Sequence, residues 1–317
     1  MSAVPILIIA YNRPNTLNKQ LNRINLLAKT KVLISIDGAK PEIANHREKT
    51  LRVAEEWAIS TYHEVQVVNQ SKNLGIYEHL PTVMEEFFSN HSFGAILEDD
   101  IEFNSSLFDM FSSYQDLITS GNYWSVCGHN PNNTNTPSDN FLYANLEVYP
   151  SNFHSIWGWA TSAVNAKMFL NNYKTNLNSK YIREVLTQTA RQFTKDPLLQ
   201  KAFILTWQRK LSGWTMRRNE SGWDNRWVFE GWCQGALSLL PEYSLSREEL
   251  NQTEGQTHLH STVGQEWKNH GNRSYVFYLS SKNNKMEISL LTVWGIRRLY
   301  AWLFSLRIFR QLKQFSL

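Results

Sequence analysis

The N-terminal third of the chain alternates between short apolar runs and segments with helical spacing, and this alternation constrains the fold more than any other feature. The expected elements, strand and helix in turn, are Val4–Ala10, Thr16–Lys29, Val32–Ile36, Ile43–Ile59, Glu64–Val68, His79–Ser89 and Phe93–Leu97. Such alternation favours a mostly parallel sheet with helices on both faces. We therefore predict an α/β fold whose ligands bind beyond the carboxyl ends of the strands.

Length and composition narrow the class of protein. The 317 residues fit one large α/β domain or two modest ones. A content of 42% hydrophobic and 19% charged residues excludes a disordered or collagen-like chain. The net charge of +4 is not gathered into Lys/Arg runs, which argues against nucleic-acid binding. Two cysteines, Cys127 and Cys233, are too few for a disulfide framework or a four-thiolate zinc site.

Polar side chains follow three of the expected strands at the point where each strand ends. Tyr11–Arg13 follow the first strand, Asp37 follows the second and Glu98–Asp100 follow the fourth. Because the carboxyl ends of parallel strands meet at one edge of a sheet, we expect these positions to share one rim.

The acidic triplet Glu98-Asp99-Asp100 is the strongest local signal. Three adjacent carboxylates repel one another and resist burial. A divalent cation resolves this, because Mg²⁺ and Mn²⁺ prefer oxygen ligands and take the rest of their shell from water and substrate phosphates. The alternative is an acidic cap on the helix that is expected to begin near Ser105.

Two tryptophan-flanked motifs are further candidates. Asp224 lies between Trp223 and Trp227, where partial desolvation would raise the pKa of its carboxyl toward general-base duty. The alternative is that Asp224 pairs with Arg226 or caps a helix. In the second motif, Trp157 and Trp159 flank a glycine and could form a wall for a sugar or base, or belong to the core.

Two weaker signals complete the set. Lys72–Gly75 carries Asn73 in a glycine-containing turn before a helix, and such a turn can approach a nucleotide closely. His258 lies on a polar segment and could complete a metal shell or contact a phosphate. A plain helix cap and a plain surface histidine are the respective alternatives.

The order of these motifs along the chain resembles that of the GT-A glycosyltransferases. The matching segments are Tyr11-Asn12-Arg13-Pro14, Ser35-Ile36-Asp37-Gly38, Asn73-Leu74-Gly75, Glu98-Asp99-Asp100, Trp157-Gly158-Trp159, Trp223-Asp224-Asn225-Arg226-Trp227 and Gly255-Gln256-Thr257-His258. The Glu-Asp-Asp form resembles the N-acetylglucosaminyltransferase I group and its bacterial relatives. The resemblance implies a GT-A fold, that is, a Rossmann-like, mostly parallel central sheet.

The resemblance also implies a role for each acid. Asp100 would bind Mn²⁺ or Mg²⁺ that bridges the donor diphosphate. His258 matches a C-terminal histidine of many members and is the second candidate metal ligand. Glu98 and Asp99 would contact the ribose or donor sugar, and Asp224 would be the catalytic base.

The remaining implied contacts are to the nucleotide and the acceptor. Asp37 would face the nucleobase, with the turn at Asn73 nearby, and Arg13 would face the nucleotide or its phosphates. Trp157 and Trp159 would form the acceptor-side wall.

The resemblance divides the chain into a transferase domain, 1–265, and a C-terminal helical segment, 266–317. A Pro/Asn-rich segment, Asn130–Asn140, separates a nucleotide half (1–128) from an acceptor half (129–265). Ile288–Phe315 is rich in Trp, Phe and Arg. It is read either as a helix at an anionic membrane surface or as a segment that packs onto the domain or a second subunit.

The implied function is metal-dependent, inverting transfer of a sugar from a nucleotide-diphospho-sugar. The first expectation is a UDP-sugar such as UDP-GlcNAc, with a glycan or lipid-linked glycan acceptor in bacterial surface polysaccharide synthesis. No run like a secretory signal or a membrane span is apparent, so a cytoplasmic location, peripheral on the inner membrane face, is expected. The alternatives are a non-catalytic carbohydrate-binding protein on the same fold, a sugar nucleotidyltransferase and a metal-dependent hydrolase.

Overall fold

The computed structural model describes residues 3–130, 147–212 and 222–248. All of these residues belong to one compact unit of the chain. His258, the segment Ile288–Phe315 and the expected domain boundary at 265 lie outside the described residues. No helix in these ranges is both long and apolar enough to cross a membrane.

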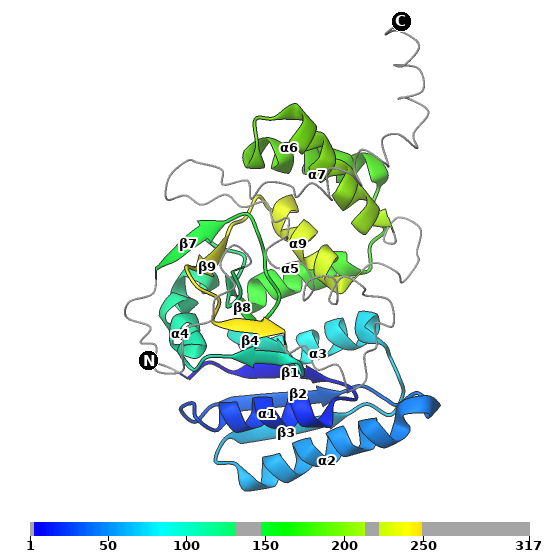
Figure 1. Cartoon of the computed structure of the whole chain (residues 1–317), viewed down its shortest axis with the longest axis vertical. Coiled ribbons are helices and arrows are strands. Elements are labelled where there is room, and N and C mark those ends of the chain that lie inside the picture. The colour runs from blue at the N-terminus through cyan, green and yellow to red at the C-terminus, as the bar shows by residue number, and fades with distance from the viewer. Residues whose placement is uncertain (1–2, 131–146, 213–221, 249–317) are drawn as a thin grey trace, which may run out of the picture. The chain divides into compact units, whose positions relative to one another are not determined.

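An eight-stranded sheet forms the centre of the described structure, in the order β3-β2-β1-β4-β8-β6-β9-β7 (Figure 1). The strands are β1 (Ile6–Ala10), β2 (Lys31–Ile36), β3 (Glu64–Asn69), β4 (Phe93–Glu98), β6 (Val126–Cys127), β7 (Val148–Ser151), β8 (Trp159–Ser162) and β9 (Ser238–Pro241). The first four strands are parallel, whereas β8 runs antiparallel to both β4 and β6. β9 is parallel to β6, and β7 is antiparallel to β9.

Helices cover both faces of this sheet. They are α1 (Pro14–Ile24), α2 (Ala44–Ser60), α3 (Ile76–Asn90), α4 (Ser106–Thr119), α5 (Ala163–Tyr173), α6 (Ser179–Phe193), α7 (Pro197–Lys210) and α9 (Trp223–Cys233), with a 3₁₀ turn at Pro41–Ile43. The α/β class and the helices on both faces confirm the expectation from the sequence. Each strand and helix expected between residues 4 and 97 is present, with its ends shifted by a few residues.

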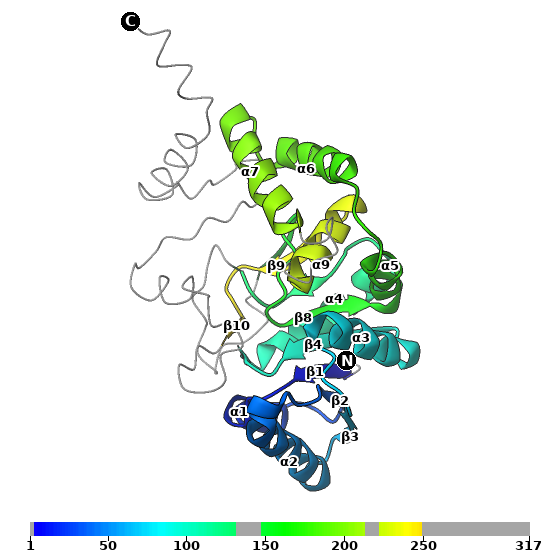
Figure 2. The ribbon, with the colours of Figure 1, turned by 90° about the vertical axis from the view of Figure 1, so that its right-hand side faces the viewer.

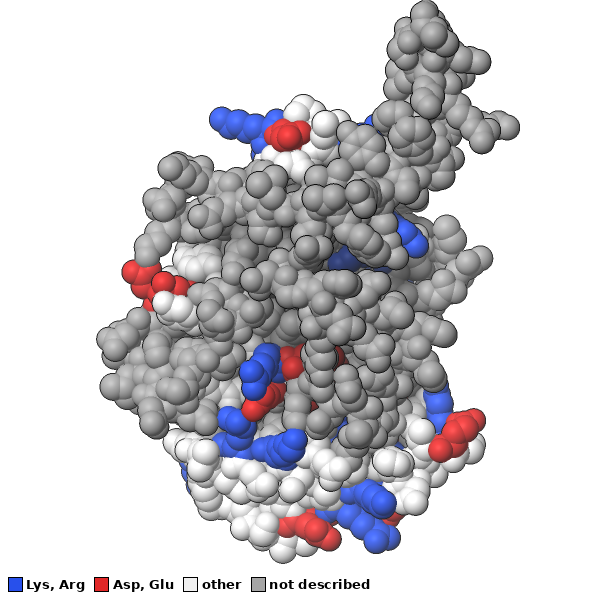
Figure 3. Space-filling view, in the orientation of Figure 1, with Lys and Arg blue, Asp and Glu red and all other residues white. Residues whose placement is uncertain are grey.

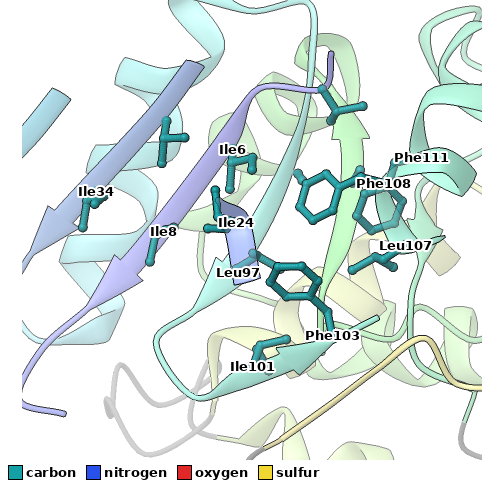
Figure 4. Close-up of a cluster of buried hydrophobic side chains, with 14 of the residues drawn as sticks. Ile6, Ile8, Ile24, Ile34, Leu97, Ile101, Phe103, Leu107, Phe108 and Phe111 are labelled. Atoms are coloured by element: carbon teal, nitrogen blue, oxygen red, sulfur yellow. The ribbon is translucent and has the colours of Figure 1, made fainter. Parts of the chain in front are cut away.

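Alternate residues of the central strands feed two separate cores, because successive side chains of a strand point to opposite faces. Ile6 and Ile8 of β1 pack with side chains of α1, α2 and α4 on one face (Figure 4). Leu7 and Ile9 pack with side chains of α3, α5 and α9 on the other. This pattern explains why β1 reads as an unbroken apolar run in the sequence.

A topological switch point lies between β1 and β4. From β1 the chain goes to β2 on one side, and it later returns to place β4 on the other side. Crevices at such points, beyond the carboxyl ends of the strands, bind ligands in open α/β sheets. Here those ends lead directly into Tyr11–Arg13 and Glu98–Asp100.

A buried glutamine fixes the turn that carries the acids. Gln20 of α1 donates through Nε2 to the backbone oxygens of Glu98 and Ile101, each at 2.8 Å. The triplet therefore forms the turn between β4 and β5 (Ile101–Phe103), and α4 begins only after β5. The alternative in which the triplet caps that helix is excluded, because Ser105 is its N-cap and Asp109 is the acid in its first turn.

A second, two-stranded sheet joins distant parts of the chain at this place. β10 (Ser246–Glu248) pairs antiparallel with β5, so that Glu248 lies opposite Ile101. Glu102 of β5 accepts hydrogen bonds from Arg23, at 2.9 Å, and from Arg247, at 2.8 Å. This pairing brings Glu248 beside the acidic turn.

Helices α6 and α7 lie side by side and pack on α9 (Figure 2). The contact is aromatic: the ring of Trp207 lies 4.4 Å from that of Trp232, and Phe203 lies 5.4 Å from the same ring. Aromatic pairs at this separation contribute beyond their buried area. Much of the unusual aromatic content therefore belongs to the core.

Two buried histidines make the stability of the fold depend on pH. Burial lowers the pKa of His154 to about 3 and that of His129 to about 4. The Nδ1 of His154 is 2.6 Å from the Ser238 hydroxyl, and its ring packs against Gly231. Both side chains are therefore neutral in the native protein near neutral pH.

We expect the free energy of unfolding to fall as pH decreases from about 6.5 toward 4. In this window the unfolded chain binds protons that the native chain excludes. Each of the two histidines contributes up to about 1.4 kcal/mol per pH unit. Chemical denaturation as a function of pH measures this slope. His154→Gln should show a shallower slope, whereas a variant of the exposed His46, His46→Gln, should keep the wild-type slope. Equal slopes for all three proteins would contradict the assignment.

Candidate functional site

The acidic turn is held against the end of β1 by direct contacts. The backbone N–H of Tyr11 donates to Asp99 Oδ2 at 3.0 Å, and Arg13 Nη1 donates to Asp99 Oδ1 at 3.0 Å. Arg13 Nη1 also forms a close ion pair with Asp100 Oδ2. The carboxylates are largely buried, with 6% of the Asp99 side chain and 11% of the Asp100 side chain exposed. One guanidinium thus bridges two adjacent carboxylates.

This cluster has more negative than positive charge. Burial, together with the charges of Asp100 and Asp99, raises the pKa of Glu98 well above its usual value. Burial also raises the pKa of Asp99 to about 6, although Arg13 opposes this shift. The three acids in turn raise the pKa of Arg13, although burial alone would lower it. Arg13 therefore stays charged, and the cluster attracts further cations or protons.

Asp37, at the end of β2, holds the turn before α3. Its Oδ1 accepts from the N–H groups of Gly38 and Leu74, both at 2.8 Å. Its Oδ2 accepts from Gly75 N at 2.8 Å and from Asn73 Nδ2 at 3.2 Å. The carboxylate is 4% exposed. Both of its oxygens are thus committed to the protein itself, whereas the sequence alone suggested that Asp37 faces a nucleobase.

Asn73 links this turn to the end of β1. Its Nδ2 lies 2.8 Å from the Gly38 carbonyl oxygen and 3.1 Å from the Tyr11 hydroxyl. Gly38 allows the close approach, because a Cβ there would lie 2.1 Å from the carbonyl carbon of Lys72. The ends of β1 and β2 and the turn before α3 therefore form one connected rim, as the strand ends predict.

Asp224 lies in the first turn of α9, where a carboxylate interacts favourably with the helix N-terminus. It also contributes to the raised pKa of Glu98, after the larger effects of burial, Asp100 and Asp99. Residues far apart in sequence are thus brought within electrostatic range of one another.

The orientation of α9 is fixed by a buried polar network. Arg226 is paired with Glu230 at 3.8 Å, and both side chains are almost fully buried. Arg226 Nη2 donates to the Asn172 carbonyl oxygen at 2.6 Å, near the end of α5. Asn172 Nδ2 in turn donates to Glu230 Oε1 at 2.7 Å. Because these contacts lock α9 to α5, they also set the place of Asp224.

Trp157 and Trp159 have different surroundings. The Trp159 ring is 1% exposed and lies 4.3 Å from the Trp227 ring, inside the core. Trp157 is half-buried, and its ring lies 4.6 Å from that of His129. Of the two rings, only Trp157 keeps surface with which an acceptor could be contacted.

Two charged residues near the site were missed by sequence reasoning. Burial raises the pKa of Glu248, Asp100 raises it further and Arg13 opposes both, so Glu248 is part of the cluster. Burial lowers the pKa of Lys210 and Asp224 offsets part of this effect, while Lys210 Nζ lies 4.6 Å from the Trp207 ring centre. Neither residue stands in a recognisable motif, because long-range packing alone brings each of them here.

The donor set limits how a metal ion could bind. In the described part of the chain, no group of three or more His, Cys, Asp and Glu side chains could hold a metal ion by itself. Asp100 Oδ2 is paired with Arg13, which leaves Oδ1 as its available oxygen. Mg²⁺ sites commonly use one or two carboxylates and complete their shell with water and substrate phosphates. The residues fit an ion that arrives with a diphosphate. His258 lies outside the described residues.

Charged side chains on the surface do not form a one-signed patch where they can be seen. On the face shown in Figure 3, Lys and Arg are interspersed with Asp and Glu among the described residues. The concentration of acids is a feature of the partly buried crevice rather than of this surface.

No protein-family model matches the chain, and no curated protein matches it. Among solved structures, the chain is similar to mouse xyloside xylosyltransferase 1 in its apo form, with 10% sequence identity and a TM-score of 0.38. The match covers 74% of this chain and 83% of that one. At this score the similarity carries no argument about function, and the site is judged on its own residues.

Asp37→Asn should destabilise the protein by on the order of 3 kcal/mol, because an amide NH₂ would replace an oxygen that accepts two of the hydrogen bonds from the turn. Urea denaturation measures the loss. Asp116→Asn is the matched control, since Asp116 is exposed on α4. A stability equal to that of the control would contradict the role of Asp37 as the anchor of the turn.

Proposed function

We propose that this chain is a metal-dependent glycosyltransferase that moves a sugar from a nucleotide-diphospho-sugar to an acceptor hydroxyl, with inversion at the anomeric carbon. The observation that carries the proposal is the cluster of Glu98, Asp99 and Asp100 around Arg13 at the β1/β4 switch point, with Asp224 in electrostatic range. The sequence resemblance to the GT-A glycosyltransferases favours a UDP-sugar, with UDP-GlcNAc first, and a bacterial surface glycan as the acceptor.

The charge of the crevice supports a divalent cation. Glu98, Asp99, Asp100 and Glu248 stand against the single guanidinium of Arg13. A diphosphate is itself negatively charged, so such a crevice repels it unless a cation comes with it. Asp100 would hold this ion, which would supply electrostatic stabilisation to the charge that develops on the departing diphosphate.

The rest of the donor would extend along the rim toward β2. Tyr11 lies beside the acidic turn through its backbone N–H, and its hydroxyl contacts Asn73. In this proposal the Asp37 carboxylate acts by keeping the turn at Asn73 in place, and the nucleoside is contacted by the groups that this turn presents. The raised pKa values of Glu98 and Asp99 fit a role as hydrogen-bond donors to a sugar hydroxyl when protonated.

Asp224 would act as the general base. It accepts the proton of the acceptor hydroxyl as that oxygen bonds to the anomeric carbon. The bond from the anomeric carbon to the diphosphate oxygen breaks, and its electron pair leaves with the nucleoside diphosphate. Attack from the face opposite the leaving group inverts the configuration. Lys210, near Asp224, favours the ionised form of this carboxyl group.

Asp224→Asn should lower kcat by about 10²–10⁴-fold while leaving the binding of UDP and Mn²⁺ unchanged, because only the proton acceptor is lost. Steady-state kinetics and calorimetry measure the two effects. Asp116→Asn serves as the control with an exposed carboxylate. Normal turnover by Asp224→Asn would show that another group accepts the proton.

Asp100→Asn should abolish the Mn²⁺-dependent part of UDP binding measured by calorimetry, because the amide is a much weaker metal ligand. Glu102→Gln is a nearby control, since the Glu102 carboxylate faces Arg23 and Arg247 instead. Binding that is independent of Mn²⁺ in the wild-type protein would point to a metal-independent transferase.

Analysis of the products separates the reaction classes. Transfer releases nucleoside diphosphate together with a new glycoside, whereas nucleotidyl transfer releases pyrophosphate. A chain that binds the donor and forms neither product across a panel of acceptors would favour a non-catalytic binding protein.

A further inference from the structure

Arg13 acts in this structure as a cation tethered to the acidic turn. Its Nη1 contacts Asp99 Oδ1 and forms the close pair with Asp100 Oδ2, the carboxylate expected to hold the donor's ion. The backbone of Arg13 is fixed, because its carbonyl oxygen accepts hydrogen bonds from Leu17 N and from the Thr16 hydroxyl, both at 3.1 Å. The side chain is 20% exposed. Only the side chain is therefore in a position to move.

A divalent ion and Arg13 compete for the same carboxylate. Two cations on one carboxylate group repel each other, and this repulsion is strong in a partly buried site. An ion that binds Asp100 therefore requires the guanidinium to withdraw at least from Oδ2. Arg13 keeps its charge throughout, because an arginine does not lose its proton in a protein. Its charge needs another carboxylate nearby.

Glu248 is placed to receive it. The β5–β10 pairing sets Glu248 opposite Ile101, the residue that follows Asp100. The charge of Arg13 acts on Glu248, as does that of Asp100. Its neighbour Arg247 is already paired with Glu102. Among the described residues, the Glu248 carboxylate has no hydrogen bond of its own, so it can accept one from Arg13.

We propose that Arg13 moves from Asp100 to Glu248 when the ion binds, so that the chain exchanges its own cation for the metal. The proposal rests on the proposed function, because the ion is the one that accompanies the donor diphosphate. In the absence of an ion, Arg13 keeps the acidic turn folded and Asp100 occupied. The ion alone then binds weakly, because it must displace Arg13, and the diphosphate supplies the missing ligands. Donor and metal are thereby loaded together.

The test measures Mn²⁺ binding without any nucleotide, from the electron paramagnetic resonance signal of the free ion. Arg13→Gln should bind Mn²⁺ about tenfold more tightly than the wild type, because the competing cation is gone. Arg13→Lys, which cannot bridge two carboxylates in the same way, should fall between them and keeps the measurement possible if Arg13→Gln does not fold. Equal affinity of the folded variants and the wild type overturns the proposal.

A double-mutant cycle tests the part played by Glu248. Glu248→Gln should weaken Mn²⁺ binding about threefold or more in the wild-type background, because Arg13 then has no second partner. The same substitution should have no effect on Mn²⁺ binding in the Arg13→Gln background. An equal loss in both backgrounds means that Glu248 acts only through its charge, which overturns the exchange.

The exchange and the proposed reaction fail separately. A chain that shows the expected cycle but forms no glycoside refutes the reaction and leaves the exchange intact. A chain that transfers sugar while Arg13→Gln binds Mn²⁺ no more tightly than the wild type refutes the exchange alone.

Discussion

The ion pair between Arg13 and two adjacent carboxylates is the interaction on which the whole site depends. Carboxylates on a partly buried turn are costly unless a cation offsets them. Here the cost is met by a guanidinium from the end of the neighbouring strand, and by a backbone N–H from Tyr11. Without this arrangement the chain could not place acids at the switch point of its sheet in the absence of a ligand.

The same constraint shapes the surrounding structure. Gln20 fixes the acidic turn from below through two backbone oxygens, and β10 covers it from the side. The Asp37 carboxylate performs the corresponding task at the next strand end, where it gathers the N–H groups of the turn before α3. Rigid support of this kind holds functional side chains in place before a ligand arrives.

The aromatic residues serve this placement more than they serve a ligand. The rings of Trp159, Trp223 and Trp227 pack together beneath α9, and Trp207 and Trp232 join α7 to it. This packing, with the buried network of Arg226, sets where Asp224 emerges. A motif of tryptophans around an acid suggests a ligand wall in the sequence, but packing density in the folded chain assigns most of these rings to the core.

The sequence by itself determined the alternation of strands and helices, the two apolar faces of β1 and the gathering of polar residues at the strand ends. These follow from local periodicity and from the geometry of parallel sheets. Only the tertiary structure decided that the oxygens of Asp37 face inward, that Trp159 is buried and that Glu248 joins the acids. The reason is that hydrogen-bond partners and neighbours far along the chain are chosen by packing, and local sequence carries no signal for that choice.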